Sequence, residues 1–453
     1  MSRADVNRRQ FLSATGGLLA ATGLFNRVWA DGRRGDDGRP AVTSPRATSG
    51  DGAFEPNWDE RLTISVGPKK ADLVGHSEKV LQAAVDYVTR FGGGTVRVLP
   101  GEYRLDNSVF LSSSVRILGS GDETVIKKNE SRVAKIVDDS DWYDQEITLA
   151  NGHGFEVGEG VCLRTKNPHN GVTDVLKRTL VARSGNRFKL DKALRKNFWI
   201  EGNPTASALF PMITGEEIAD VVIEDITLDG NRKNNENLNG NYGGCIFFQD
   251  CNRATMRKVT TRNYNGDGMS WQICHDVVVE NCHSHDNRDL GLHPGSGSQR
   301  PLMRNNRLER NRIGLFFCWG VKYGLAEANH IDGNLDFGIS IGHRDTDNLI
   351  RENLVQKSGK VGVLFRDDTR GKDFWPNRNR LEKNRIVDSG SESGIAVDIQ
   401  GKTREVTLDG NDIQETRQPM QRAGVRIGKQ ATKISLESNR IEGFSEAVVD
   451  ERS

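Results

Sequence analysis

The chain reads GMSWQ from Gly268, GLHPG from Gly291, GLFFC from Gly314, GISIG from Gly338 and GVLFR from Gly362. In each segment a glycine is followed by apolar residues at its first and third positions. Successive glycines are separated by 23, 23, 24 and 24 residues. A fixed period of this length is typical of a solenoid, in which each unit buries its apolar face only against its neighbours.

Asparagines form a second ladder beside the glycines. They are Asn281, Asn306, Asn329, Asn353, Asn384, Asn411 and Asn439, and each follows a short run of alternating apolar residues. Because strands in adjacent coils lie about 4.8 Å apart, stacked amides would hydrogen-bond along the axis. We therefore expect these seven side chains to lie in one buried row.

These repeats predict an all-β fold. Nothing in a unit has helical periodicity, and 23 residues hold three short strands and their turns but no helix. The sequence thus predicts a right-handed, single-stranded parallel β-helix of about ten or more coils. The alternative, a leucine-rich repeat, would need an LxxLxLxxN frame, which does not recur.

The chain begins with the features of an export signal. Arg8-Arg9-Gln10-Phe11-Leu12 precedes a short Gly/Ala-rich apolar run and a small-x-Ala site that ends at Ala30. The paired arginines resemble a twin-arginine signal, although a chance Arg-Arg is the alternative. We expect residues 1–30 to be removed and the mature protein to be periplasmic or secreted. Residues 31–57 are rich in Gly, Pro, Ser and charge, which predicts a flexible linker.

Three further regions follow the predicted linker. Residues 58–130 should form an N-terminal cap and the first coils, because Ser77 to Phe91 has apolar residues at helical spacing. A helix there would cover the open end of the first coil. Residues 131–212 break the coil rhythm and predict a small inserted β subdomain. Residues 213–453 should form the main parallel coils.

The cap region carries a family resemblance. Gln82-Ala-Ala-Val-Asp86, then Gly93-Gly-Thr-Val96, then Leu99-Pro-Gly-Glu-Tyr-Arg104 resemble the N-terminal segment of the pectate lyase superfamily. With the coils downstream, the resemblance covers most of residues 60–450. It implies a parallel β-helix and one of several activities on polysaccharides, since the superfamily contains lyases, hydrolases, epimerases and phage tailspikes.

Composition limits the partners that we expect. Lys and Arg total 63 against 62 Asp and Glu, so there is no charge excess of the kind that binds nucleic acid. Beyond the N-terminus no apolar run is long enough to span a membrane. We expect a monomer with a polysaccharide as its partner and with no cofactor, although calcium binding, which no specific motif supports, stays open. Metal-ligand spacing is also poor, so no metal site is predicted.

Two of the six cysteines occupy matching places one coil apart. Cys251 and Cys274 each follow a similar dipeptide, Gln-Asp and Gln-Ile. Strands in adjacent coils are close enough for a disulfide. The alternative, which the sequence favours, is a stacked pair of buried thiols.

The alternation after each glycine predicts an outward-facing groove. Its first and third residues are apolar and should point inward, so its second and fourth residues should point outward. The predicted catalytic residues on this face and its edges are His293, Asp289, Asp267 and Arg366. The predicted substrate-binding residues are Trp319, Phe316, Gln272, Tyr323, Lys322, His343, Arg344 and Asp367. Aromatic rings beside acid–base groups on a long sheet suit sugar rings.

Three functions remain open at this stage. A lyase would use His293 or an arginine as a base, together with a cation on the uronate carboxylate. A hydrolase would use Asp267 and Asp289, whose surroundings are similar to the Asn-Thr-Asp and Asp-Asp motifs of polygalacturonases. The remaining motifs of those enzymes are altered here, because the counterparts Asp336-Phe-Gly338 and Leu364-Phe-Arg366 lack the histidine and the first arginine. The third function is a carbohydrate-binding or surface-structural module without catalysis.

Overall fold

The computed structural model describes residues 37–43, 55–417 and 422–452. Gly38–Ser453 form one compact unit. The predicted signal in residues 1–30 and much of the predicted linker lie outside the described residues. Within the described ranges, no helix combines the length and the apolar character that crossing a membrane requires.

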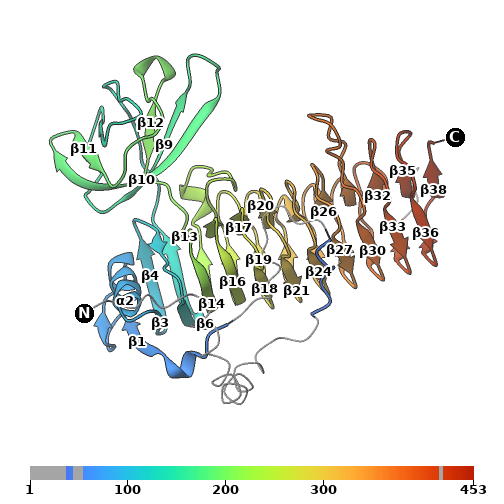
Figure 1. Cartoon of the computed structure of the whole chain (residues 1–453), viewed down its shortest axis with the longest axis horizontal. Helices are drawn as coiled ribbons and strands as arrows, with labels where there is room; N and C mark the ends of the chain where they lie inside the picture. Colours follow the sequence, from blue (N-terminus) through green and yellow to red (C-terminus); the bar gives the residue numbers. More distant parts are fainter. Residues whose placement is uncertain (1–36, 44–54, 418–421, 453) are drawn as a thin grey trace, which may run out of the picture. The chain divides into compact units, whose positions relative to one another are not determined.

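Short parallel strands stack coil upon coil into three ladders, which confirms the right-handed parallel β-helix (Figure 1). The glycine ladder, whose strands follow the repeating glycines, contains β5 (Val109–Phe110), β13 (Ile213–Glu216), β15 (Ile246–Gln249), β17 (Met269–Gln272), β20 (Leu290–Gly295), β23 (Ile313–Phe316), β26 (Phe337–Ile341), β29 (Val361–Phe365), β32 (Ile395–Ile399), β35 (Ala423–Ile427) and β38 (Glu446–Asp450). Met269, Trp271 and Leu292 point from it into the core, as the alternation predicts.

The other two ladders share their first long strands, which bend from one into the other. The second ladder contains β1 (Leu62–Gly67), with β2 (Leu73–Val74) beside it, β3 (Gly94–Val98), β6 (Val115–Lys128), β14 (Ala219–Asp229), β16 (Asn252–Arg262), β18 (Val278–Glu280), β21 (Leu302–Arg304), β24 (Leu325–Glu327), β27 (Leu349–Arg351), β30 (Arg380–Glu382), β33 (Thr407–Asp409) and β36 (Ser435–Glu437). The third ladder contains β4 (Gly101–Leu105), the later parts of β6, β14 and β16, and then β19 (His283–His285), β22 (Arg307–Glu309), β25 (His330–Asp332), β28 (Leu354–Gln356), β31 (Arg385–Val387), β34 (Asp412–Gln414) and β37 (Arg440–Glu442).

An asparagine row joins consecutive coils, as predicted for six of the seven residues, of which five are buried and Asn439, at the C-terminal end, is half-buried. From Asn306 to Asn439, each side-chain Nδ2 donates to the Oδ1 of the next asparagine at 2.8–2.9 Å. The placement of Asn281 in this row is wrong. Asn281 is exposed and adopts a left-handed conformation with φ of 56°, and the next residue, Cys282, takes the place in the row. Asparagine suits both positions, because it tolerates positive φ as well as forming amide ladders.

A second amide row was missed by the sequence pattern. Asn287 donates to Asn311 at 3.1 Å, and the backbone N–H of Asn311 donates to Asn334 at 3.0 Å. These residues fill the next turn of the coil, just before the glycine ladder. Buried backbone groups at both turns are therefore satisfied by side chains, which fixes the register of the strands that follow.

A helix covers the first coil, as predicted. Helix α2 (Glu78–Arg90) is capped by the side chain of Ser77, which accepts a hydrogen bond from the N–H of Lys79. Its buried face, which includes Leu81 and Val85, packs against β1 and β3. The apolar end of the stack is thereby covered.

A separate antiparallel sheet is inserted between the early coils, and it confirms the predicted small β subdomain. Its strands are β7 (Val133–Lys135), β8 (Glu146–Thr148), β9 (Gly160–Lys166), β10 (Thr173–Ser184), β11 (Arg187–Leu190) and β12 (Thr205–Ser207). It has a hydrophobic core of its own, which includes Leu163, Leu180 and Phe188. Three short 3-10 helices complete the described elements: η2 (Trp58–Glu60), η3 (Ile200–Gly202) and η4 (Arg232–Asn234).

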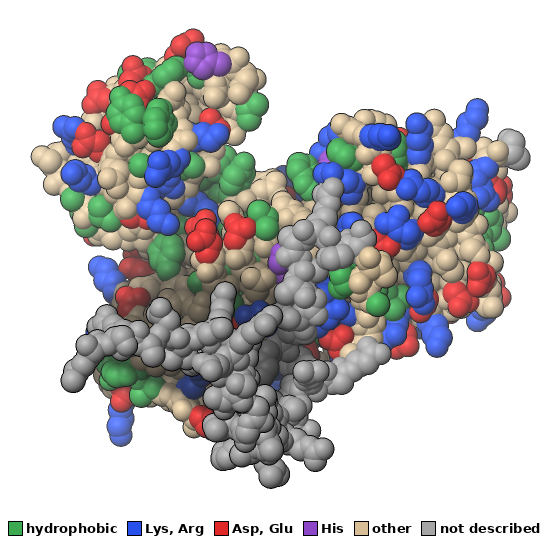
Figure 2. Space-filling view, in the orientation of Figure 1, with side chains coloured by type: hydrophobic (Ala, Val, Ile, Leu, Met, Phe, Trp, Pro, Cys, Tyr) green, Lys and Arg blue, Asp and Glu red, His purple; other side chains and the backbone are tan. Residues whose placement is uncertain are grey.

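Cys251 and Cys274 are stacked thiols in neighbouring coils. The backbone N–H of Cys251 lies 3.4 Å from the Sγ atom of Cys274, and neither sulfur is bonded to another. The surface is charged but mixed. In Figure 2, basic and acidic side chains are interspersed over the C-terminal coils, as expected from the near-equal totals of the sequence.

Candidate functional site

Matching positions of the glycine ladder form a line of side chains that point away from the core, here called the outward row. Its members, in order along the stack, are Phe110, Thr214, Phe247, Ser270, His293, Phe316, Ser340 and Leu364. Neighbours in the row belong to strands that pair directly, so they lie about 4.8 Å apart. His293 is at the middle of this line.

His293 is held by Asp267. The Nδ1 atom of His293 lies 2.8 Å from Asp267 Oδ2, and the other carboxylate oxygen accepts the N–H of Leu290 at 3.1 Å. Asp267 is fully buried and His293 is 4% exposed. The prediction that Asp267 lies along an open edge therefore needs correction, because its side chain is enclosed beneath the histidine.

The groups around the His293 ring are hydrogen-bond acceptors. Ser270 Oγ donates to the carbonyl of Gly240 at 2.6 Å, so it can only accept from His293 Nδ1, which lies 3.3 Å away. His293 Nε2 faces the carbonyl oxygen of Cys318 at 3.2 Å, which also only accepts. Both ring nitrogens therefore lie beside hydrogen-bond acceptors, Nδ1 beside Asp267 and Nε2 beside the carbonyl of Cys318. Burial raises the pKa of Asp267, although its bond with His293 opposes this.

A loop from the preceding coil covers the pair. Gly240 packs so tightly that a Cβ atom there would collide with Asp267 Oδ2 and lie 2.8 Å from His293 Nδ1. The carbonyl of the same glycine accepts from Ser270 and, at 3.4 Å, from Nε2 of Gln272. Gln272 is predicted to bind substrate, but the structure places it under this loop, where it is 4% exposed. Residues 239–241 therefore form a cover loop, and this loop packs closely against Asp267 and His293.

A cavity of about 350 Å³ opens beside the cover and is here called the histidine cavity. It is lined by Asn239, Gly240, Asn241, Asp267, Asp289, Leu290, His293, Ser296, Arg312, Phe316, Cys318, Trp319 and Arg370. The structure thus brings together five of the predicted site residues: Asp267, Asp289, His293, Phe316 and Trp319.

A row of alternating charges begins at this cavity with Asp289 and Arg312 and continues beyond it along the stack. Asp289 accepts from Asn237 at 2.8 Å and lies 3.5 Å from the guanidinium group of Arg312. Arg312 in turn reaches Asp336 at 3.4 Å, and Lys360 follows Asp336 at 2.8 Å. This row of charges was recognisable in the sequence, because all four residues stand two places before a repeating glycine. Of the four, only Asp289 was among the predicted site residues.

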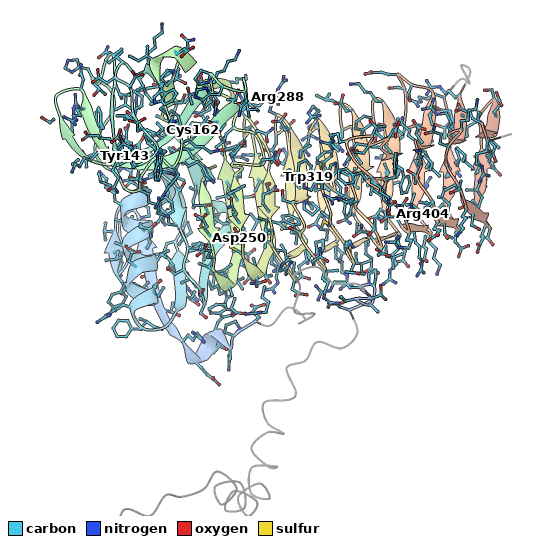
Figure 3. All side chains as sticks on the ribbon, turned by 45° about the horizontal axis from the view of Figure 1, so that its top comes forward. Tyr143, Cys162, Asp250, Arg288, Trp319 and Arg404 are labelled. Carbon is cyan, nitrogen blue, oxygen red and sulfur yellow. The ribbon has the colours of Figure 1, made fainter. Side chains whose placement is uncertain are left out.

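Another edge of the cavity is aromatic. The Trp319 ring, labelled in Figure 3, is 43% exposed and stacks on His343 with 4.3 Å between ring centroids. His343 Nδ1 lies 2.5 Å from Asp368, and Arg370 binds the same carboxylate. Burial lowers the pKa of His343 despite this acid. Burial would raise the pKa of Asp368, but hydrogen bonds, chiefly from Arg370, bring it down to about 2. Neutral His343 is therefore clamped between a carboxylate and a tryptophan.

The other predicted residues do not line the histidine cavity. Arg366 covers the outer face of Phe316 at 4.4 Å and donates to Ser340 Oγ at 2.6 Å. Tyr323 is 1% exposed and therefore offers no surface to a ligand. The remaining three residues are placed elsewhere. Lys322 and Arg344 line a different cavity of about 160 Å³, and Asp367 accepts from the indole of Trp375 at 2.7 Å.

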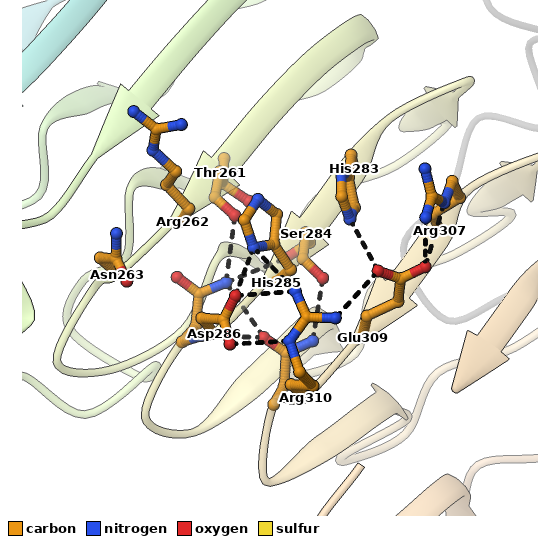
Figure 4. Close-up of polar contacts among 12 residues, drawn as sticks. Thr261, Arg262, Asn263, His283, Ser284, His285, Asp286, Arg307, Glu309 and Arg310 are labelled. Atoms are coloured by element: carbon orange, nitrogen blue, oxygen red, sulfur yellow. Dashed lines mark hydrogen bonds and ion pairs between the residues drawn. The ribbon is translucent and has the colours of Figure 1, made fainter. Parts of the chain in front are cut away.

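Two surface histidines lie on another ladder and stay outside the site. His283 and His285 stack at 4.1 Å on β19, where they face Glu309 and Asp286 (Figure 4). Arg310 bridges the two acids, so the cluster is internally paired. Among the described residues, no group of three or more His, Cys, Asp or Glu side chains is arranged to hold a metal ion.

Comparison with known proteins agrees with the architecture. A family model for the right-handed β-helix region matches residues 220–377. The A-module of the mannuronan C-5 epimerase AlgE4 from Azotobacter vinelandii superimposes with a TM-score of 0.54 at 17% identity, covering 84% of this chain and 97% of that one. The AlgE6 A-module of the same organism superimposes with a TM-score of 0.50 at 17% identity, covering 82% of this chain and 94% of that one. ORF18 of Geobacillus virus E2 superimposes with a TM-score of 0.50 at 12% identity, covering 85% of this chain and 61% of that one.

These likenesses concern the fold alone, because the identities are low. The chain is a right-handed parallel β-helix protein. A search of curated protein sequences finds no match.

Proposed function

We propose that this chain acts on an acidic polysaccharide by transferring protons at a uronate unit bound over the histidine cavity. One observation carries the proposal. The buried, hydrogen-bonded His293–Asp267 pair faces a cavity that also contains the carboxylate of Asp289. A proton donor and a proton acceptor at one open site are what acid–base chemistry on a polymer requires.

The neighbouring groups support a uronate rather than a neutral sugar. Arg312 and Arg370 both line the cavity, and a guanidinium group can bind a carboxylate through two parallel hydrogen bonds. Neutralising that carboxylate makes the adjacent C5 proton more acidic. Trp319 is exposed at the edge, where a sugar ring can stack on it. Two neighbours of the same fold are named as mannuronan epimerases, which makes polymannuronate the first substrate to test.

The chemistry divides into two outcomes. In both, Asp289 takes the C5 proton and His293 donates its own. If His293 protonates O4 as the C4–O4 bond breaks, the product has an unsaturated end and the reaction is a lyase reaction. If the acid instead protonates C5 from the other face, the sugar is inverted and the backbone of the polymer stays intact. Asp267 is in either case a positioning residue, because it contacts His293 and not the substrate.

Hydrolysis is less well supported by this geometry. An inverting or retaining hydrolase needs two carboxyl groups that both reach the glycosidic bond or its water. Both oxygens of Asp267 are already bonded, to Leu290 and to His293, and its side chain is fully buried. The alternative of binding without catalysis is favoured by the cover over His293, since Gly240 leaves the ring only 4% exposed.

A panel of polymannuronate, polyguluronate, polygalacturonate and a neutral glucan separates these functions. Unsaturated ends indicate a lyase, deuterium uptake at C5 in heavy water without cleavage indicates an epimerase, and new saturated reducing ends indicate a hydrolase. His293→Gln should abolish turnover, whereas His330→Gln, on β25 of another ladder, should not. Binding of a polyuronate without any of the three products would establish the non-catalytic alternative.

Export belongs to the same proposal. The paired arginines Arg8 and Arg9 and the cleavage site at Ala30 support export from the cytoplasm. Export would bring the protein to the extended polysaccharides that lie outside the cytoplasm. Replacing both arginines by lysine should leave the uncleaved precursor in the cytoplasm. Normal export of that double variant would rule out the twin-arginine route.

A further inference from the structure

A second cavity lies farther along the outward row, where the inserted sheet meets the first coils. It has a volume of about 450 Å³ and is here called the insertion cavity. Its floor includes Phe110, Thr214 and Phe247 of the outward row, and its roof includes Val175 and Lys177 of β10. The cavity therefore lies between the β-helix surface and the inserted subdomain. The proposed function gives this subdomain no role.

Lys177 is the polar centre of this cavity. Its Nζ atom lies 3.9 Å from the centroid of the Phe247 ring, a cation–π contact. In the described part of the chain, no acid approaches this ammonium group closely enough to form an ion pair, and Glu216 acts on it only over a longer range. Burial lowers the pKa of Lys177 to about 8, so the group still carries its proton at neutral pH. A largely enclosed cation without an ion-pair partner favours an anion from outside.

The remaining lining suits a sugar ring. Phe110 is 45% exposed, whereas the Phe247 ring, two strands farther along the same row, is 2% exposed beneath Lys177. Aromatic faces like that of Phe110 pack against the apolar faces of sugars. Arg178, a second cation of the lining, uses its guanidinium group on the backbone carbonyls of residues 177 and 192–194, so it is held as part of the frame. The lining also includes Asp191, Lys192 and Glu216, which are exposed at the surface, so three cations face two acids and the net charge is positive. Lys177 is the more enclosed of the two lysines that line the cavity.

The two cavities are neighbours on one line. Phe247 and His293 are separated in the outward row only by Ser270, so they lie about 10 Å apart, two strand spacings of about 4.8 Å, which is roughly two sugar units. The cover loop touches both cavities, since Gly240 lines the histidine cavity and Tyr242 lines the insertion cavity. A polymer that follows the row past this loop reaches both.

We propose that the insertion cavity is a subsite for an acidic sugar unit, in which Lys177, held over the Phe247 ring, binds the carboxylate and Phe110 packs against the sugar ring. This rests on the proposed function and adds a role for the inserted subdomain, which is to hold a uronate about two units away from the one at His293. The site selects for charge and for chain length, because a short oligomer fills only one of the two cavities.

The test is calorimetric binding of a hexamannuronate or hexagalacturonate to the full chain. Lys177→Met keeps the apolar stem and should weaken hexauronate binding about tenfold, the value of one charged hydrogen bond. Glu216→Gln removes the negative charge that acts on Lys177 and should strengthen hexauronate binding. The matched control is Lys189→Met, an exposed lysine on β11 of the same inserted sheet, which should change nothing. A carboxyl-reduced, neutral hexamer should bind wild type and Lys177→Met equally.

A labelling experiment locates the ligand without relying on any variant. Acetylation of Lys177 by acetic anhydride, followed by mass spectrometry, should be slowed by the hexauronate and not by the dimer or by free acetate. Equal protection by acetate would mean a small-anion site and would overturn the sugar subsite. If wild type and Lys177→Met bind the hexauronate equally tightly, the insertion-cavity subsite is ruled out and the proposed function is not. If wild type binds no uronate at all, both the subsite and the proposed function are ruled out.

Discussion

The carboxylate of Asp267 and the imidazole of His293 lie 2.8 Å apart, although 26 residues separate them in the chain. They meet because adjacent coils are in register, and Asp267 stands directly before a repeating glycine. In the following coils that place is held by Leu290, Ile313 and Phe337, which are apolar. A buried acid in an otherwise apolar column costs stability, so its presence points to function.

Asp267→Asn should lower turnover about 100-fold or more while the fold is retained. The amide has nearly the same shape, but it cannot carry the charge that steadies a protonated His293. The assay is initial rate on the active polyuronate, with circular dichroism as the check on folding. Asp250→Asn is the matched control, because Asp250 is a turn residue with positive φ in a different part of the coil (Figure 3). Full activity in Asp267→Asn would remove the pair from the mechanism.

Gly240→Ala should displace the cover loop. The new methyl group would collide with the Asp267 carboxylate, so residues 239–241 must lift away from His293. We expect turnover to fall at least about tenfold and the melting temperature to drop by a few degrees, consistent with a local loss of about 1–2 kcal/mol. The control is Gly428→Ala in the C-terminal part of the chain, where the nearest atom to the new methyl would be 3.0 Å away. An unchanged rate would show that the cover is irrelevant to turnover.

The sequence predicts the stack well, because its physical causes are periodic. A 23-residue period and a two-residue alternation together put His293 and Phe316 side by side on the outward row. The cover was not predictable, since residues 230–243 form a loop without a period, and nothing local signals that Gly240 will reach Asp267. The pairing of His343 with Asp368 was not predicted for a similar reason, because the acid lies 25 residues away in an irregular segment.

Asn329→Ala should lower the free energy of unfolding by about 1–3 kcal/mol. The amide of Asn329 donates to Met303 O and to Asn353, and its oxygen accepts from Asn306, so the change orphans buried groups in two neighbouring coils. Urea unfolding measures the loss. Asn281→Gly, at the exposed left-handed position outside the row, should have an effect within about 0.5 kcal/mol. Equal effects of the two changes would mean that the row adds no stability.

Stability should fall with rising pH because of Asp345. This buried carboxyl accepts the backbone N–H groups of Val321 and Gly342. Burial raises its pKa from 3.8 to about 7, against the attraction of Arg366. The unfolded chain loses this proton first, so between about pH 4 and 7 the folded state binds more protons and is progressively destabilised. The unfolding free energy of wild type minus that of Asp345→Asn should therefore be lower at pH 8 than at pH 5. A difference that is the same at both pH values contradicts the assignment.

Trp319→Ala should weaken polymer binding about tenfold without unfolding the protein, since one aromatic contact contributes about 0.5–1.5 kcal/mol beyond its buried area. The ring lines the histidine cavity and rests on His343, so a bound sugar would change its environment and quench or shift its fluorescence. Trp142→Ala is the matched control, because Trp142 is 53% exposed but lies in the inserted subdomain and lines neither cavity. If the fluorescence response to the polyuronate persists in Trp319→Ala and disappears in Trp142→Ala, the polymer binds elsewhere and the histidine cavity is not its site.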